Sequence, residues 1–136
     1  MGVPKVAAIN DLSGFGKCSL TAALPILAAM GVQATPLPTA VLSSQTAFPG
    51  FVCVDISKHF SAFFQEWTQH LPTFQGIYSG FLFNEEQVEL VERFLDRFCS
   101  EDTAVVIDPV LGDEGVYYPI FHEGMRKAML RLIGRG

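Results

Sequence analysis

The sequence alternates short apolar runs with longer stretches in which apolar residues recur at helical spacing. The runs are KVAAIN at 5–10, VQATPLPTAVL at 32–42, FQGIYSGFLF at 74–83 and TAVVID at 103–108. Helices are expected at 17–30, over an aromatic stripe near residues 60–71, after Asn84 and at 119–133. This alternation predicts an α/β fold with a mainly parallel sheet and helices on both faces.

Local signals indicate where two of the helices begin and end. In the helix at 17–30, Pro25 predicts a kink or an early break, and Gly31 supplies a stop. Asn84 is placed to cap the helix that follows it, with Gln87 three residues on to return the bond. The buried face of that helix is expected to carry Val88, Val91, Leu95 and Phe98.

An aromatic stripe lies in the middle of the chain. It consists of Phe60, Phe63, Phe64, Trp67 and Leu71. Helical spacing of this kind predicts a face packed against a core, with a ligand-stacking surface as the alternative.

Length and composition exclude several functional classes. The chain has 136 residues, enough for one domain, and its net charge of −5 leaves no basic footprint for nucleic acid. Three distant cysteines without a CxxC pair favour a reducing cytoplasm over a disulfide framework or a zinc site. The longest apolar run, LTAALPILAAMGV, is shorter than the roughly twenty residues that span a membrane, and no targeting segment is recognised.

Polar residues follow each of the four apolar runs. In a parallel sheet the carboxyl ends of the strands form the ligand-binding edge, so Asp11, Thr39, Gly80 and Asp108 are expected at one common edge. The clusters are Asn10, Asp11, Ser13, Gly14 and Gly16; Thr39, Ser43, Ser44, Gln45 and Thr46; Tyr78, Ser79, Gly80 and Phe81; and Asp108, Gly112 and Asp113. Taken singly, each has a structural alternative as a helix cap, a turn or a strand terminator.

Together the clusters favour phosphoryl transfer. Small polar groups beside an aromatic ring suit a small hydroxylated aromatic substrate, and the paired acids Asp108 and Asp113 suit a metal-bound polyphosphate. The stretch SGFGKCS lacks the spacing of a GxxxxGK[ST] phosphate loop and is better interpreted as a turn that lets backbone approach a substrate. The three histidines match no ligand spacing and are expected at the surface or in satisfied positions.

Four motifs in this order resemble the N-terminal half of pyridoxal (pyridoxine/pyridoxamine) kinases of the ribokinase-like superfamily. They are AINDLSGFGKCSLTAALPILAAMG, PLPTAVLSSQTAF, YSGFL and VVIDPVLGDEGVYY, and they cover nearly the whole chain. The resemblance implies a three-layer α/β/α fold, of which residues 1–136 form the substrate-side part of one kinase domain. It also implies ATP-dependent phosphorylation of the 5′-hydroxymethyl group of vitamin B6.

The resemblance also implies roles for individual residues. Asp11 and Thr39 stand where the family contacts the substituents of the pyridine ring, and Phe81 stands where many members have a tyrosine beside it. Asp108 and Asp113 match the two acids near the metal and the ATP phosphates. Ser13 and Ser43 complete the expected substrate contacts, although this chain reads SSQTA from Ser43 where SNHTG is commoner.

The family's general base lies in a glycine-rich GxGD turn, and these 136 residues contain no such sequence. The chain is therefore expected to be an N-terminal portion that is inactive by itself. The resemblance implies Mg²⁺ and ATP, with a monovalent cation as a further option. It implies a B6 vitamer as the substrate and a homodimer as the assembly. Neither nucleic acid nor a membrane is expected as a partner. Vitamer preference cannot be carried over.

Two alternatives stay open. Hydroxymethylpyrimidine kinases share the fold and a similar opening motif, whereas the DPVLGD spelling and the hydroxyl run at 43–46 favour the B6 branch. The other alternative is a non-catalytic binding or assembly module that keeps the substrate pocket without the ATP side. Ligand binding without turnover would favour that module.

Overall fold

The predicted apolar runs form one mainly parallel sheet. The computed structural model describes residues 2–70, 73–119 and 121–136, and within them the strand order is β3-β2-β1-β4-β5. All neighbouring pairs are parallel except β2 with β3. The strands are β1 (Lys5–Phe15), β2 (Gln33–Ser44), β3 (Cys53–Asp55), β4 (Gly76–Ser79) and β5 (Ala104–Ile107).

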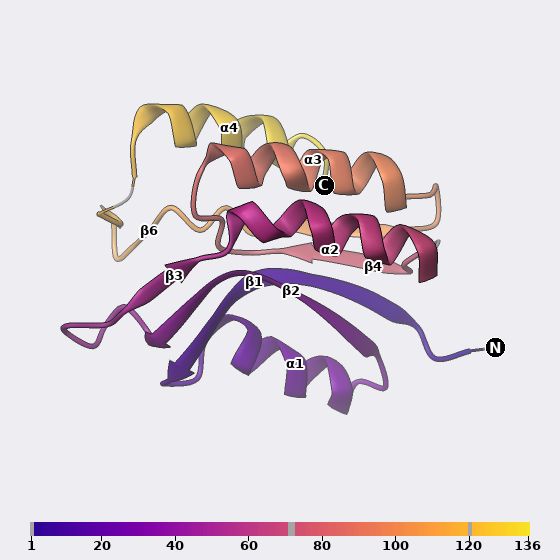
Figure 1. The fold of residues 1–136 in the computed structure, drawn as a ribbon, viewed down its shortest axis with the longest axis horizontal. Helices are drawn as coiled ribbons and strands as arrows, with labels where there is room; N and C mark the ends of the chain where they lie inside the picture. Colours follow the sequence, from indigo (N-terminus) through magenta and orange to yellow (C-terminus); the bar gives the residue numbers. More distant parts are fainter. Residues whose placement is uncertain (1, 71–72, 120) are drawn as a thin grey trace.

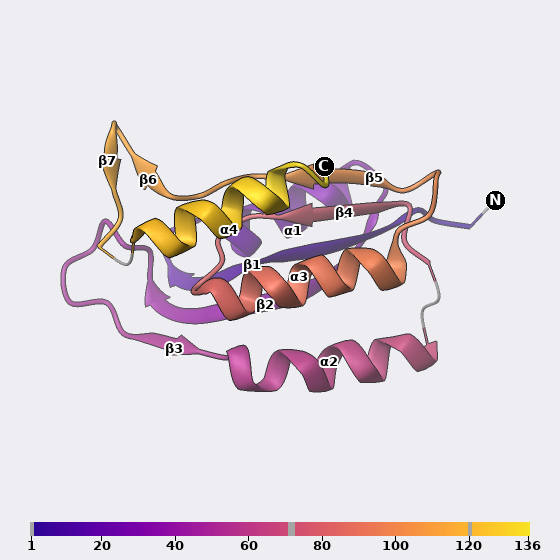
Figure 2. The ribbon, with the colours of Figure 1, turned by 90° about the horizontal axis from the view of Figure 1, so that it is seen from above.

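Helices lie on both faces of this sheet, which confirms the predicted three-layer α/β/α arrangement. Helix α1 (Ser19–Ala29) packs on one face against β1 and β2. Three helices lie on the other face, with α3 between α2 and α4 (Figures 1 and 2); they are α2 (Ser57–His70), α3 (Glu85–Phe98) and α4 (Glu123–Ile133). Over the described part of the chain, no helix has the length and apolar character needed to cross a membrane.

Strand β1 is longer than the predicted run at 5–10. Beyond Asn10 it stays paired with β2 as far as Phe15, so Gly14 lies in a strand and not in a turn. A Cβ on Gly14 would lie 2.8 Å from the Ser43 carbonyl oxygen, so glycine permits this close approach of the two strands. Strands β1 and β2 thus extend past the end of β4 and, with β3, form an extension of the sheet that we call the flap (residues 11–15, 39–44 and 53–55; Figure 1).

The core lies between the sheet and the three-helix layer. Phe94 and Phe98 of α3 are fully buried, with ring centroids 4.5 Å apart. Around them pack Phe60, Phe64, Trp67 and Phe74. The aromatic stripe of α2 is therefore a core face, as predicted, except that Phe63 is 41% exposed at its margin. Leu71 falls outside the described residues.

Three other elements differ from what the sequence suggests in their exposure or their bounds. Strand β5 comes from an apolar run, yet Val106 is 57% exposed, because α1 packs mainly on β1 and β2 on that face. Helix α4 begins at Glu123 and not near 119, since the His122 imidazole Nδ1 accepts a hydrogen bond from the Met125 N–H (3.3 Å) and caps the helix there. Helix α1 continues past Pro25 to Ala29 instead of ending early.

We expect the two faces of α2 to differ sharply in their effect on stability. Phe60→Ala empties a fully buried site and should lower the free energy of unfolding by about 3–5 kcal/mol. Phe63→Ala on the same helix should cost less than about 1 kcal/mol, because that ring already contacts water. Urea denaturation followed by circular dichroism measures both, and equal losses would contradict the assignment of the core face.

Candidate active site

The strand positions before Asn10, Gly80 and Asp108 lie at one level of the sheet, as predicted, although β1 and β2 continue beyond it. Ile9 of β1 pairs with Ser79 of β4, and Ser79 pairs with Ile107 of β5. The residues that follow these strand positions are therefore neighbours along the edge. They include Asn10, Asp11, Gly80 and Asp108, and Thr39 lies at the same level of β2.

An irregularity in the sheet lies at this edge. Asn10 pairs with Pro38 and Leu12 pairs with Val41, so Asp11 alone faces the two residues Thr39 and Ala40. This arrangement is a β-bulge, which bends a strand and redirects its side chains. The bulge is located at the residues that the sequence pattern had singled out.

The Asn10 side chain connects β1 to the loop that follows β4. Its Oδ1 accepts hydrogen bonds from the N–H groups of Asp11 (2.9 Å) and Phe81 (2.8 Å), and its Nδ2 donates to the Tyr78 hydroxyl (3.3 Å). A Cβ on Gly80 would lie 2.8 Å from Asn10 Oδ1 and closer still to the rest of the amide. Only glycine therefore fits beside this buried amide.

Asp11 and Ser13 form a buried polar pair on β1. Asp11 is 6% exposed, and its Oδ2 accepts a hydrogen bond of 2.9 Å from the fully buried Ser13 hydroxyl. Cys53 of β3 lies near this pair, since it is joined to Ser13 through Leu42 in the strand register. The pKa of its thiol is raised by burial first, then by Asp55 and then by Asp11. The edge thus offers a carboxylate, a hydroxyl and a thiol within one small region.

Thr39 supports the Phe81 loop. It is fully buried, and its hydroxyl donates to the Phe81 carbonyl oxygen (2.8 Å), so it holds the backbone of the residue expected beside the substrate ring. The Phe81 side chain itself is half-buried. The expected contacts of Thr39 and Phe81 with substrate stay predictions.

Ser43 is not brought together with the other predicted substrate contacts. Ser13 pairs with Leu42, so the next residue, Ser43, projects from the opposite face of the flap. Its hydroxyl accepts a hydrogen bond from the Val52 N–H (2.8 Å). In this structure Ser43 therefore closes the loop at 45–52, and its role toward a substrate stays a prediction.

The Tyr118 phenol lies within the electrostatic reach of all three predicted site acids. Its pKa is raised by burial first and then by Asp113, Asp108 and Asp11. Asp108 also raises the pKa of Tyr78, after the larger effect of burial. Both Asp108 and Asp113 are exposed.

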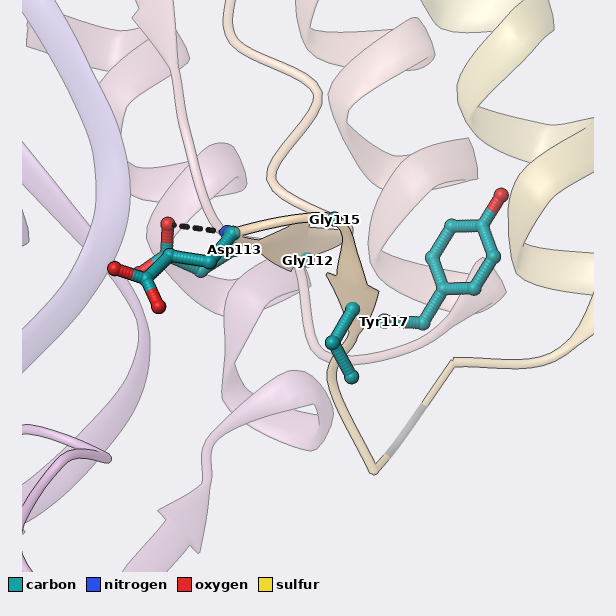
Figure 3. A pocket seen from close by; sticks show the side chains of 6 residues that line it. Gly112, Asp113, Gly115 and Tyr117 are labelled. Carbon is teal, nitrogen blue, oxygen red and sulfur yellow. Dashed lines mark hydrogen bonds between the residues drawn. The ribbon is translucent and has the colours of Figure 1, made fainter.

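Asp113 is carried on a short hairpin formed by β6 (Gly112–Asp113) and β7 (Val116–Tyr117). Figure 3 shows the Asp113 carboxylate on one side of this hairpin and the Tyr117 ring on the other. A Cβ on Gly112 would lie 2.9 Å from the Tyr117 Cα, so glycine allows the two strands to approach. The hairpin residues line a hollow of about 400 Å³.

A second hollow, of about 420 Å³, lies between α1 and the ends of β4 and β5. Its polar lining includes Asn10, Tyr78 and Asp108, and its apolar wall comes from Ala22, Ala23, Ile26 and Leu27 of α1. Asp108 is therefore accessible from this side of the sheet, whereas Asp11 and Ser13 are buried in the flap region.

Asp108 and Asp113 suit a magnesium ion shared with substrate phosphates better than a metal site built from protein ligands alone. The part of the chain that the structure describes contains no cluster of three His, Cys, Asp or Glu side chains that could hold a metal. Mg²⁺ is commonly held by one or two carboxylates together with substrate phosphates. Asp108 and Asp113, both exposed and both near Tyr118, match that smaller ligand set.

Comparison with solved structures identifies the class of protein to which this arrangement belongs. The chain has the α/β fold of ribokinase-like kinases, and within that class its fold is that of the pyridoxal kinases. No family model matches the sequence, and no curated protein matches it.

The solved structures that match span the whole of this chain. A provisionally named phosphomethylpyrimidine kinase from Bacteroides thetaiotaomicron, crystallised with pyridoxal, is 43% identical with a TM-score of 0.96 over 99% of this chain and 47% of its own. Pyridoxal kinase from Lactobacillus plantarum is 31% identical with a TM-score of 0.89 over 97% of this chain and 47% of its own. This chain therefore spans about half the length of these relatives.

A more distant structure shares the fold alone. Pyridoxal kinase from Leishmania donovani, solved with ADP and pyridoxamine, is 21% identical with a TM-score of 0.82 over 97% of this chain and 48% of its own. At this identity the likeness concerns the path of the backbone.

Sequence reasoning overlooked several residues of the edge. Asn10 was expected at the edge, with a helix cap as the alternative, but its role in joining two strand ends was not foreseen. Cys53 and Tyr118 were not considered at the site, because their nearness to the acids depends on β3 pairing with β2 and on the hairpin. One signal in the sequence could have indicated the role of Asn10. Gly80 directly follows Tyr78 and Ser79, and a glycine at the end of a strand often marks a place where another group comes close to the backbone.

We expect Gly80→Ala to destabilise the edge. The new methyl group would overlap the Asn10 amide and displace it from its partners on Asp11 and Phe81, which should cost about 1–3 kcal/mol of unfolding free energy. Gly76 lies at the start of β4, and Gly76→Ala is the control, because its methyl group would meet the Val6 side chain at 3.1 Å and the Ala104 carbonyl oxygen only at 3.6 Å, an ordinary contact distance. Urea denaturation compares the two, and a larger loss for Gly76→Ala would contradict this account.

Proposed function

We propose that this chain is the vitamer-binding, N-terminal part of a kinase that phosphorylates the 5′-hydroxymethyl group of pyridoxal, pyridoxine or pyridoxamine with ATP. The observation that carries the proposal is the 43% identical structure crystallised with pyridoxal, which matches 99% of this chain with a TM-score of 0.96. The matched chain is about twice as long, so the proposal for the whole enzyme extends beyond these 136 residues.

The residues of the edge suit this chemistry. In the proposed complex the buried Asp11–Ser13 pair contacts the polar substituents of the pyridine ring, and the Phe81 ring lies against its face. Thr39 keeps the backbone of Phe81 in place. Asp108 and Asp113, on the exposed side of the same edge, face the ATP phosphates.

Magnesium would neutralise the charge that develops on the transferring phosphoryl group, and Asp108 and Asp113 would hold it together with the phosphates. A neighbouring kinase solved with ADP supports nucleotide as the second substrate. A monovalent cation remains an expectation of the resemblance alone. We also retain the cytoplasm as the expected compartment, because Cys18, Cys53 and Cys99 are free thiols.

Hydroxymethylpyrimidine phosphorylation is the second candidate. The relative crystallised with pyridoxal bears the provisional name of a phosphomethylpyrimidine kinase, which favours keeping this alternative. Both substrates are nitrogen heterocycles with a hydroxymethyl group, so the Asp11–Ser13 pair and Phe81 suit either one. Competition between pyridoxal and hydroxymethylpyrimidine for the chain distinguishes the two.

We expect the 136-residue chain to bind pyridoxal without phosphorylating it, because it contains no GxGD turn to supply a general base. Asp11→Asn should weaken pyridoxal binding about tenfold by removing a buried charged acceptor, whereas Asp113→Asn on the phosphate side should leave binding unchanged. Isothermal titration and a coupled ATPase assay measure the two quantities. Equal losses of pyridoxal affinity in the two variants would show that Asp11 and Asp113 do not contact different ligands, the vitamer and the ATP phosphates.

We also propose that the chain forms a homodimer through the flap. The flap and its loop at 45–52 expose several large apolar side chains: Phe15, Val41, Phe48, Phe51, Val52 and Val54. Val41 and Val54 are cross-strand partners on one face of the flap, and the exposed Phe15 ring packs 5.1 Å from the Phe48 ring of the loop. Apolar patches of this kind commonly mark protein interfaces.

We expect light scattering at protein concentrations of roughly 10–100 µM to report a dimer. Val54→Lys should shift the chain to monomer, because a charge beside its exposed cross-strand partner Val41 would have to be buried in the interface without a partner. Val106→Lys on β5 is the control, since that residue is exposed outside the flap. Dissociation by Val106→Lys alone would assign the interface to the other edge of the sheet.

A further inference from the structure

A fully buried amide, Gln87, lies in the first turn of α3 beside the candidate site. Its sequence position predicted a capping role, and its backbone N–H does donate to the Asn84 side chain (2.9 Å). The expected return bond to the Asn84 backbone is not formed, because the Gln87 Oε1 accepts from the Phe83 N–H instead (2.8 Å). The side chain therefore serves the loop before the helix and not the cap itself.

Gln87 holds both sides of the Phe81 loop. Its Nε2 donates to the Thr39 carbonyl oxygen (2.6 Å), and the Thr39 hydroxyl donates to the Phe81 carbonyl oxygen (2.8 Å). Its Oε1 accepts from Phe83, two residues further along the same loop. One amide thus connects the bulged position of β2 with the loop that carries Phe81.

The same amide reaches the junction between β3 and α2. Gln87 Nε2 lies 2.9 Å from the Ser57 hydroxyl oxygen and 3.4 Å from an Asp55 carboxylate oxygen. The Ser57 hydroxyl donates to Asp55 (2.5 Å) and accepts from the Asn84 Nδ2 (3.2 Å). The last strand of the flap is therefore connected to the Phe81 loop through Gln87.

Burial of these groups restricts how far β2, the flap and the Phe81 loop can move apart. Gln87 and Thr39 have no solvent exposure and Ser57 has 5%, so water does not readily replace a lost partner. A buried amide left without partners costs about 1–3 kcal/mol, which disfavours any arrangement in which β2, the flap and the loop move apart. Phe81, whose own N–H is bonded to Asn10 and not to Gln87, is held at the centre of this arrangement.

We propose that Gln87 is a positioning residue for the vitamer site: it sets the place of Phe81 relative to Asp11 by joining Thr39, the Phe81–Phe83 loop and the β3–α2 junction. The proposal rests on the proposed function for its consequence in vitamer binding. The geometric part, that Gln87 holds the loop, does not depend on the identity of the substrate.

Hydrogen exchange of the wild-type chain and Gln87→Met tests the geometric part. Methionine has a similar size but offers neither the amide donors nor the acceptor. We expect the Phe83 amide to lose protection from exchange, because its acceptor is removed. The protection of the Phe81 amide should also fall at least about fivefold, although its acceptor on Asn10 is unchanged. Loss at Phe83 with unchanged protection at Phe81 would overturn the proposal.

Thr103→Val is the matched control. It removes a side-chain hydrogen bond to a backbone carbonyl, that of Phe74, at the opposite end of the sheet (2.9 Å). It should lower the melting temperature without altering exchange at Phe81. If it changes Phe81 as Gln87→Met does, the effect reflects general destabilisation and the proposal fails.

Gln87→Glu provides a second variant in case the methionine variant does not fold. It keeps an acceptor for the Phe83 N–H but offers at most one O–H donor, when its buried carboxyl is protonated, where Gln87 has an amide donor shared by Thr39 and Ser57. Loss of protection at Phe81 is again the expected result. Unfolding of both variants would show that Gln87 serves the fold as a whole and would overturn its assignment as a positioning residue.

Titration with pyridoxal tests the consequence for binding. Gln87→Met should raise the dissociation constant for pyridoxal about tenfold, and Thr103→Val should leave it unchanged. In a Phe81→Ala background, Gln87→Met should have little further effect, because the two residues act through one contact. Additive losses would overturn the proposal, whereas a wild-type chain that does not bind pyridoxal would refute the proposed function and leave the exchange result to decide the role of Gln87.

Discussion

The parallel pairing of β1 with both β2 and β4 is the constraint on which the candidate site depends. Backbone hydrogen bonds align Ile9 with Leu37 on one side and with Ser79 on the other, so the residues after these strand positions share one edge. A shift of one residue in either register would turn Asp11 toward the other face of the sheet. The position of the acids is thus a consequence of backbone pairing more than of any contact between their side chains.

Two buried amides stabilise what this pairing brings together. Asn10 joins the ends of β1 and β4, and Gln87 joins β2 to the same loop from the helical layer. Both are almost completely excluded from water, so each must keep its hydrogen-bond partners. The Phe81 N–H donates to the Asn10 Oδ1 and the Phe81 carbonyl oxygen accepts from the Thr39 hydroxyl, so its backbone is held on both sides.

The two faces of the molecule differ in how completely they are covered. Three helices cover one face with an aromatic core, whereas α1 alone lies on the other and leaves Val106 exposed. Exposed apolar groups also occur on the flap, on the outer side of Val41 and Val54. The candidate site lies where the covered core gives way to these open surfaces, with Asp11 on the buried side and Asp108 and Asp113 on the exposed side.

The sequence by itself determined the α/β class, the aromatic core face of α2, the Asn84 cap and the common edge with Asp11 and Asp108, because these depend on local periodicity and on where apolar runs end. Only the tertiary structure decided that β1 continues into the flap, that Ser43 faces away from Ser13, and that Gln87 binds Thr39 and Ser57. Those outcomes depend on partners far away in the chain, 48 residues in the case of Gln87 and Thr39, and no local pattern encodes which distant acceptor a buried amide will meet.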